Sequence, residues 1–113
     1  MTHRKRGLKS QLWFAKRDAR KRGLAWHIAD KRAMKLMQQP CHWCSAPPNP
    51  YNGLDRLNNE PFYHASNIVP CCWRCNRCKG TMTAAEWIRF CASVVSRRFG
   101  AVRDGQHLLT MSN

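Results

Sequence analysis

Paired cysteines are the first residues in this sequence whose types and spacing indicate chemistry. Cys41 and Cys44 form one CxxC turn, and about thirty residues later the segment 71–78 holds four more cysteines. Each CxxC turn can offer two thiolates, and four thiolates complete the tetrahedral shell that Zn²⁺ prefers. Two pairs in the later segment have this spacing, namely Cys72 with Cys75 and Cys75 with Cys78. The sequence therefore predicts one structural Zn²⁺ site, made by the first turn and one of these pairs.

Two oxygen-bearing side chains close to the cysteines could hold a harder metal ion. Asp55 lies in the apolar-flanked segment 53–57, and Asn76 directly follows Cys75. Phosphodiester cleavage needs a cation on the scissile phosphate and the leaving oxygen, and Mg²⁺ prefers oxygen ligands. If the expected strand and helix pack together, Asp55 and Asn76 supply a carboxylate and an amide oxygen and leave positions open for phosphate and water. The chemistry of these two side chains thus suits a Mg²⁺ or Mn²⁺ ion.

The segments 53–59, 64–70 and 75–80 together resemble the HNH (His-Me finger) endonucleases, in particular the phage-type members whose CxxC turns bracket the site. The resemblance implies a small ββα-metal core with a four-cysteine zinc site, and it implies that a Mg²⁺ or Mn²⁺ ion held by Asp55 and Asn76 is catalytic. It assigns the site residues by position, with Asp55 in the acidic place, Asn67 in the middle place and Asn76 in the last place. It also favours Cys72 and Cys75 as the second zinc pair, which leaves Cys78 spare.

The chain departs from the family at the position after the acid. The resemblance, which covers about residues 41–90, implies a general-base histidine there, whereas this chain has Arg56. Arginine stays protonated and cannot accept a proton from water. Three interpretations follow: Arg56 clamps phosphate while metal-bound water acts as the nucleophile, His64 moves in as the base, or the domain binds nucleic acid without cutting it.

Basic residues outnumber acidic residues by twenty to six, and the excess is concentrated at the N-terminus. Residues 1–35 hold twelve Lys and Arg but only two Asp, a net charge of +10. Such an excess indicates a polyphosphate partner, because basic side chains gain affinity by releasing condensed counterions. We expect nucleic acid, most directly double-stranded DNA, to contact ten basic residues: Arg4, Lys5, Arg6, Lys16, Arg17, Arg20, Lys21, Arg22, Arg77 and Lys79.

Other partners and compartments are disfavoured by the same composition. No run of eighteen apolar residues is present, and no apolar signal-peptide core follows the basic start of the chain. We therefore expect a cytoplasmic protein, in the host-cell cytoplasm if it is viral, with no membrane partner and no small-molecule cofactor. Nothing in the sequence sets the oligomeric state.

The elements expected to position these residues make an α+β fold. The pattern predicts helices over 10–22 and 30–38, an extended segment over 24–29, strands over 53–57 and 66–69, a short helix near Cys75, and a longer helix over 84–98 behind a capping box at Thr83. Asp30 is expected to cap the second helix. The domain plan is a basic helical lead-in over 1–40, a zinc-bracketed core with a C-terminal helix over 41–99, and a tail over 100–113, in one compact domain.

These observations predict a Mg²⁺-dependent DNA endonuclease of the HNH type. The alternative is a zinc-containing module, derived from such a nuclease, that binds DNA or RNA without cutting it.

Overall fold

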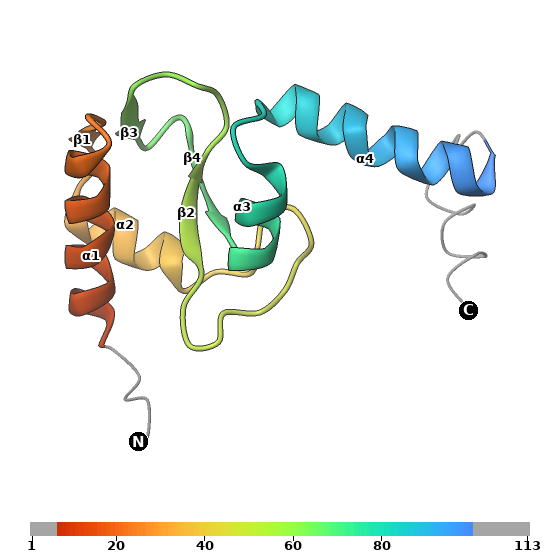
Figure 1. The fold of residues 1–113 in the computed structure, drawn as a ribbon. Coiled ribbons are helices and arrows are strands. Elements are labelled where there is room, and N and C mark those ends of the chain that lie inside the picture. The colour runs from red at the N-terminus through yellow and green to blue at the C-terminus, as the bar shows by residue number, and fades with distance from the viewer. Residues whose placement is uncertain (1–6, 101–113) are drawn as a thin grey trace. The chain divides into compact units, whose positions relative to one another are not determined.

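The computed structural model describes residues 7–100, in which four helices and four strands follow one another (Figure 1). Their bounds are α1 Leu8–Lys21, β1 Ala25–His27, α2 Asp30–Met37, β2 Gly53–Arg56, β3 Phe62–His64, β4 Ile68–Cys71, α3 Trp73–Lys79 and α4 Ala84–Phe99. The chain divides into two units at Thr81, so that α4 forms the second unit by itself. The α+β fold class predicted from the sequence is confirmed, with two small two-stranded sheets.

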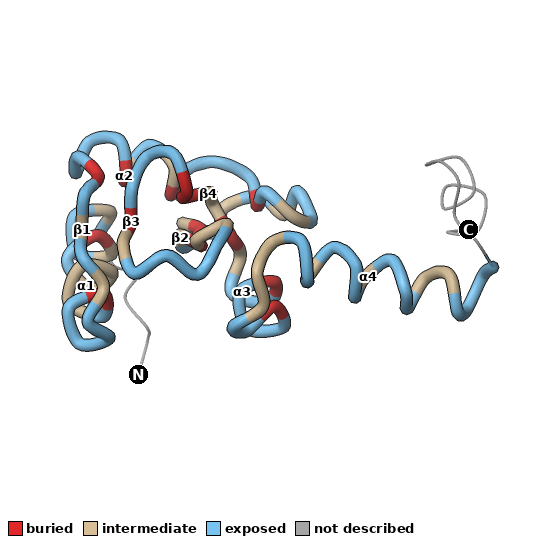
Figure 2. The backbone as a smooth tube through the Cα atoms, turned by 90° about the horizontal axis from the view of Figure 1, so that it is seen from above, coloured by how far each residue is buried: buried red, intermediate tan, exposed pale blue. Residues whose placement is uncertain are grey.

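The apolar core of the first unit joins residues that are far apart in the chain. Leu12 and Ala19 on α1 pack with Ala33 on α2, and Tyr63 and Ile68 complete the cluster. The buried positions of α1 and α2 recur at helical spacing, as amphipathic helices require. The expected lead-in over 1–40 therefore shares one core with the centre of the chain (Figure 2).

The second sheet carries the central residues. β2 and β4 are antiparallel, with Asp55 opposite Val69 and Arg56 opposite Ile68. α3 begins two residues after β4 ends, so the chain order here is strand, strand, helix. In both views β2 and β4 lie between α1 and α3 (Figures 1 and 2).

A third strand, β3, was missing from the sequence-based prediction. β3 pairs in parallel with β1, with Trp26 opposite Tyr63, and the rings of these two residues stack. The segment is only three residues long and follows Pro61, so alternation over four or more residues, the usual strand signal, is absent. β3 is a strand because it pairs with β1, a segment distant in the sequence, and not because of a pattern in its own residues.

The ends of α1 and α2 differ in how well the sequence predicts them. α1 ends in a Schellman motif, in which Leu24 N–H donates to the Ala19 carbonyl and Gly23 N–H to the Arg20 carbonyl. Gly23 has a φ of 72°, the left-handed conformation that this motif requires. The expected cap at Asp30 is wrong: Ala29 is the N-cap of α2, without a side-chain bond, and Asp30 instead pairs with Lys16 at 3.0 Å.

α4 begins as the sequence predicts, with a capping box between Thr83 and Glu86. The Glu86 side chain accepts a hydrogen bond from Thr83 N–H, which lowers the pKa of Glu86. Within α4 no residue is buried, and the apolar side chains of Phe90 and Val94 are exposed. Among residues 7–100, no helix combines the length and the apolar character needed to cross a membrane.

Candidate functional site

Four cysteines come together at one end of the second sheet. The Sγ atoms of Cys41, Cys44, Cys72 and Cys75 all lie within 4.8 Å of one another, and Cys44 Sγ is 3.7 Å from Cys72 Sγ. Four thiolate sulfurs at these separations suit a tetrahedral thiophilic ion such as Zn²⁺. The second pair is thus Cys72 with Cys75, because Cys78 is exposed and outside the cluster.

Local hydrogen bonds place the two cysteine turns. The first turn is anchored to β4, since His42 N–H donates to the Pro70 carbonyl at 2.8 Å. Asn52 holds the same turn to the end of α2, because its buried side-chain amide donates to the carbonyls of Gln39 and Ala46. In the second turn, Cys72 is the N-cap of α3, and its sulfur accepts from Cys75 N–H at 3.4 Å. These bonds place the two turns so that their four sulfurs meet.

The surroundings of the sulfurs favour thiolate at one position and thiol at another. Burial opposes ionisation of Cys41, but the backbone N–H groups of Cys72, Cys44 and Trp43 outweigh it and lower the pKa of Cys41 to about 6. Burial raises the pKa of the neighbouring Cys71 far above its usual range. Cys71 lies outside the cluster and packs as a small apolar residue in the core around it.

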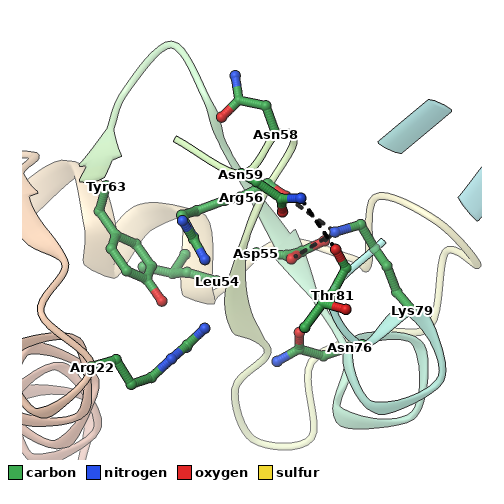
Figure 3. Close-up of a pocket in the computed structure, with 11 residues that line it drawn as sticks. Arg22, Leu54, Asp55, Arg56, Asn58, Asn59, Tyr63, Asn76, Lys79 and Thr81 are labelled. Atoms are coloured by element: carbon green, nitrogen blue, oxygen red, sulfur yellow. Dashed lines mark hydrogen bonds and ion pairs between the residues drawn. The ribbon is translucent and has the colours of Figure 1, made fainter. Parts of the chain in front are cut away.

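A pocket of about 260 Å³ lies beside the cysteine cluster, between β2 and α3 (Figure 3). It brings together three of the predicted site residues, namely Asp55 and Arg56 from β2 and Asn76 from α3. Most of the remaining lining residues are polar or basic: Arg22, Leu54, Asn58, Asn59, Tyr63, Lys79, Gly80 and Thr81.

The carboxylate of Asp55 is held from two sides. Trp43, inside the first cysteine turn, donates its indole N–H to Asp55 Oδ2 at 3.2 Å. Lys79 Nζ lies 3.3 Å from each carboxylate oxygen and 3.2 Å from the Arg56 carbonyl. Asp55 is 8% exposed and Lys79 is 4% exposed, so this is a buried ion pair. The cysteine cluster and the pocket thus share one hydrogen-bonded network.

Arg56 and Asn76 differ in how they are held. Arg56 Nη1 donates to the Glu60 carbonyl, which anchors one edge of the guanidinium. Asn76 is the fourth residue of α3, not the residue that opens the helix, because α3 already begins at Trp73. The Asn76 side chain makes no hydrogen bond with any other residue in the described range, so its amide oxygen is free to bind a ligand.

Asn67 and His64 do not line this pocket. Asn67 is buried and fastens its own loop: its Oδ1 accepts from His64 N–H at 2.8 Å, and its Nδ2 donates to Asn58 and Phe62. The His64 ring is exposed and bonds to Ser66. Asn67 therefore shapes the loop that carries Asn58, and His64, the last residue of β3, is exposed and does not line the pocket.

The ten basic residues expected to contact nucleic acid fall into different settings. Lys79 is buried in the ion pair described above, which takes it off the molecular surface. Lys16 and Arg17 pair with Asp30 and Asp18, and Arg17 also packs on the rings of Trp13 and Phe14. The exposed members are Arg20, Lys21, Arg22 and Arg77, whereas Arg4, Lys5 and Arg6 lie outside the described residues.

Trp43 and Tyr63 are among the site residues that the sequence did not predict. Trp43 was passed over as a spacer within a CxxC turn, although an aromatic donor next to a metal ligand is a signal that could have drawn attention. Tyr63 was overlooked because the strand that carries it, β3, was not predicted.

The chain has little detectable similarity to known proteins. No known family matches the chain, and no solved structure matches it. An uncharacterized protein of Acanthamoeba polyphaga mimivirus is 30% identical over 76 residues, which is 66% of this chain. The matching stretch is only 14% of the viral protein, so the chain is similar to a small part of a much longer polypeptide.

Proposed function

We propose that the protein is a Mg²⁺- or Mn²⁺-dependent DNA endonuclease of the HNH type. The observation that carries the proposal is that Asp55 and Arg56 on β2 and Asn76 on α3 line the same pocket. The order of β2, β4 and α3 agrees with the ββα-metal core that the sequence resemblance implies. The adjacent four-cysteine cluster suits a metal ion, which would stabilise this small core.

The residues present fit a hard cation in the pocket. A carboxylate has about four lone-pair positions, and Trp43 and Lys79 leave part of that capacity free on Asp55. Asn76 adds an unused amide oxygen. Mg²⁺ at such a site would neutralise charge on the scissile phosphate and on the leaving 3′ oxygen. Arg56 would hold a phosphate oxygen, since its guanidinium cannot take the proton that an attacking water loses.

A second candidate, a nucleic-acid-binding module that does not cut, is favoured by Lys79. Its ammonium already supplies a positive charge at both oxygens of Asp55, where a nuclease of this type needs a metal ion. Together with Arg56 in place of a general base, this contact would suit a site that binds phosphate only. The two candidates share a partner and differ in whether a phosphodiester bond breaks.

Nicking of supercoiled plasmid, with and without Mg²⁺, separates the two candidates. We expect Mg²⁺-dependent cutting by the wild type, loss of cutting in Asp55→Asn, and a higher rate in Arg56→His, because histidine restores a proton acceptor. General-base catalysis contributes roughly a hundredfold to ten-thousandfold, so the restored base should be visible above a slow background. Arg32→His, an exposed change on α2 outside the pocket and outside the ten expected contacts, is the matched control and should leave the rate unchanged.

The nuclease proposal fails if pure protein cuts no supercoiled, linear, branched or single-stranded DNA and Arg56→His does not awaken it. Binding of the same DNA by that protein would then support the module that does not cut. His64→Ala should be silent in either case, because the His64 ring is exposed and does not line the pocket.

Binding itself should depend steeply on salt. The exposed basic residues near the end of α1 provide phosphate contacts, and each contact releases condensed counterions. We expect log affinity to fall linearly with log salt, with a slope of about −0.9 per phosphate neutralised on duplex DNA. Fluorescence anisotropy of a labelled duplex between 50 and 200 mM salt, roughly the range in which such proteins lose most affinity, measures it. A flat dependence would contradict a phosphate-based partner.

A further inference from the structure

Two arginines from distant parts of the chain meet in the pocket. Arg22 is the C-cap of α1, and Arg56 ends β2. Both line the same cavity of about 260 Å³. Figure 3 shows their guanidinium groups directed into one space beside the hydroxyl of Tyr63. A helix of the basic lead-in therefore contributes a side chain to the centre of the site.

The pocket holds more positive charge than its own residues neutralise. Its lining has three cationic side chains, Arg22, Arg56 and Lys79, and a single carboxylate, Asp55, which gives a net formal charge of +2. Lys79 Nζ lies 3.3 Å from each oxygen of that carboxylate and offsets its charge. Within residues 7–100 no carboxylate lies in ion-pair distance of Arg22 or Arg56. Two like charges directed into one space repel each other unless an anion lies between them.

The backbone of Arg22 and the guanidinium of Arg56 are each held by hydrogen bonds within the protein. The Schellman motif at Gly23 fixes the end of α1 and with it the backbone of Arg22. The Glu60 carbonyl binds one edge of Arg56 and leaves the other N–H groups available. The Tyr63 hydroxyl makes no hydrogen bond with any residue of the described range. These groups together offer a tetrahedral anion donors from three directions.

We propose that Arg22 and Arg56 hold one and the same phosphodiester of a bound DNA strand, with the Tyr63 hydroxyl donating to the same group. Arg22 is then a binding residue of the site, unlike Arg20, which is exposed on α1 but does not line the pocket. The inference rests on the nucleic-acid partner of the proposed function and is independent of whether the strand is cut.

A double-mutant cycle on duplex binding tests the shared phosphate. The variants are Arg22→Gln, Arg56→Gln and both together, with Arg20→Gln and its combination with Arg56→Gln as the matched set. Affinity for a labelled duplex is measured without added Mg²⁺. Each pocket variant should bind about tenfold more weakly, as expected for a charge-assisted hydrogen bond. The affinity loss of the pocket double variant should be far smaller than a hundredfold. The first change already impairs the contact with the shared phosphate, so the second change removes less.

The Arg20 combination should instead multiply the two single effects, because Arg20 contacts a different phosphate if any. Purely multiplicative losses for Arg22 with Arg56, or an Arg22→Gln variant that binds like the wild type, would overturn the inference. Arg56→Lys keeps the positive charge but removes the planar guanidinium group. It takes the place of Arg56→Gln in the double-mutant cycle if that variant misfolds. Coupling in a protein that never cuts would refute only the nuclease, and cutting without coupling would refute only the shared clamp.

Discussion

Removing the metal is expected to unfold residues 7–81. Four thiolates at the separations seen here hold two turns that are far apart in the chain. Structural Zn²⁺ contributes about 10–16 kcal/mol in zinc-finger peptides, which is comparable with the roughly 5–15 kcal/mol by which most domains are stable. We expect one Zn²⁺ per chain by metal analysis, and loss of the folded circular-dichroism spectrum with a strong chelator.

Paired serine variants show whether the correct cysteines were assigned. Cys72→Ser should lose both zinc and fold, because Cys72 is a member of the cluster and caps α3. Cys78→Ser is the matched control, since it sits six residues later on the same helix, is exposed, and should keep full zinc content. Protein purified without zinc but folded, or a Cys78→Ser variant that loses it, would contradict the assignment.

Breaking the buried pair of Asp55 with Lys79 should have the next largest effect. Lys79→Met leaves the Asp55 carboxylate buried with only the Trp43 indole as a donor. Removing one partner of a buried ion pair costs about 3–5 kcal/mol, because the remaining charge stays uncompensated. Urea unfolding of the zinc-loaded protein should show this loss. The double variant Asp55→Leu with Lys79→Met should recover much of it, since it removes both charges.

The exposed pair of Lys16 with Asp30 provides the comparison. Their side chains are 38% and 55% exposed, so solvent screens the attraction. Lys16→Met should cost at most about 1 kcal/mol. If Lys79→Met costs no more than Lys16→Met, the Asp55–Lys79 contact is not a buried ion pair in solution.

Local signals in the sequence predict the parts of the fold that local chemistry determines. The CxxC spacing predicted a four-cysteine metal site but left two choices for the second pair, and the capping box at Thr83 predicted the start of α4. Hydrophobic periodicity gave α1 and α2 to within two residues. Such features depend on residues within one or two turns of each other, so a single sequence carries them.

The features that the sequence did not reveal depend on contacts between distant segments. The strand β3 forms only because β1 pairs with it, and its three residues have no strand pattern of their own. Lys79 was expected on a phosphate-binding surface, because residue type shows charge and not burial. The assignment of its partner needed the packing of α3 against β2. The pocket position of Arg22 likewise needed the end of α1 to be placed in three dimensions.

The parallel pairing of β1 with β3 bears on how the chain folds during synthesis. α1 and α2 leave the ribosome before Tyr63 and Ile68, the residues that complete their core, have been made. At about 5–20 residues per second, roughly 1.5–6 seconds separate Ala33 from Tyr63. Throughout that interval the core between the two helices lacks Tyr63 and Ile68. The dense positive charge of residues 1–35 makes nascent chains repel one another, so we expect it to limit aggregation before any nucleic acid is bound.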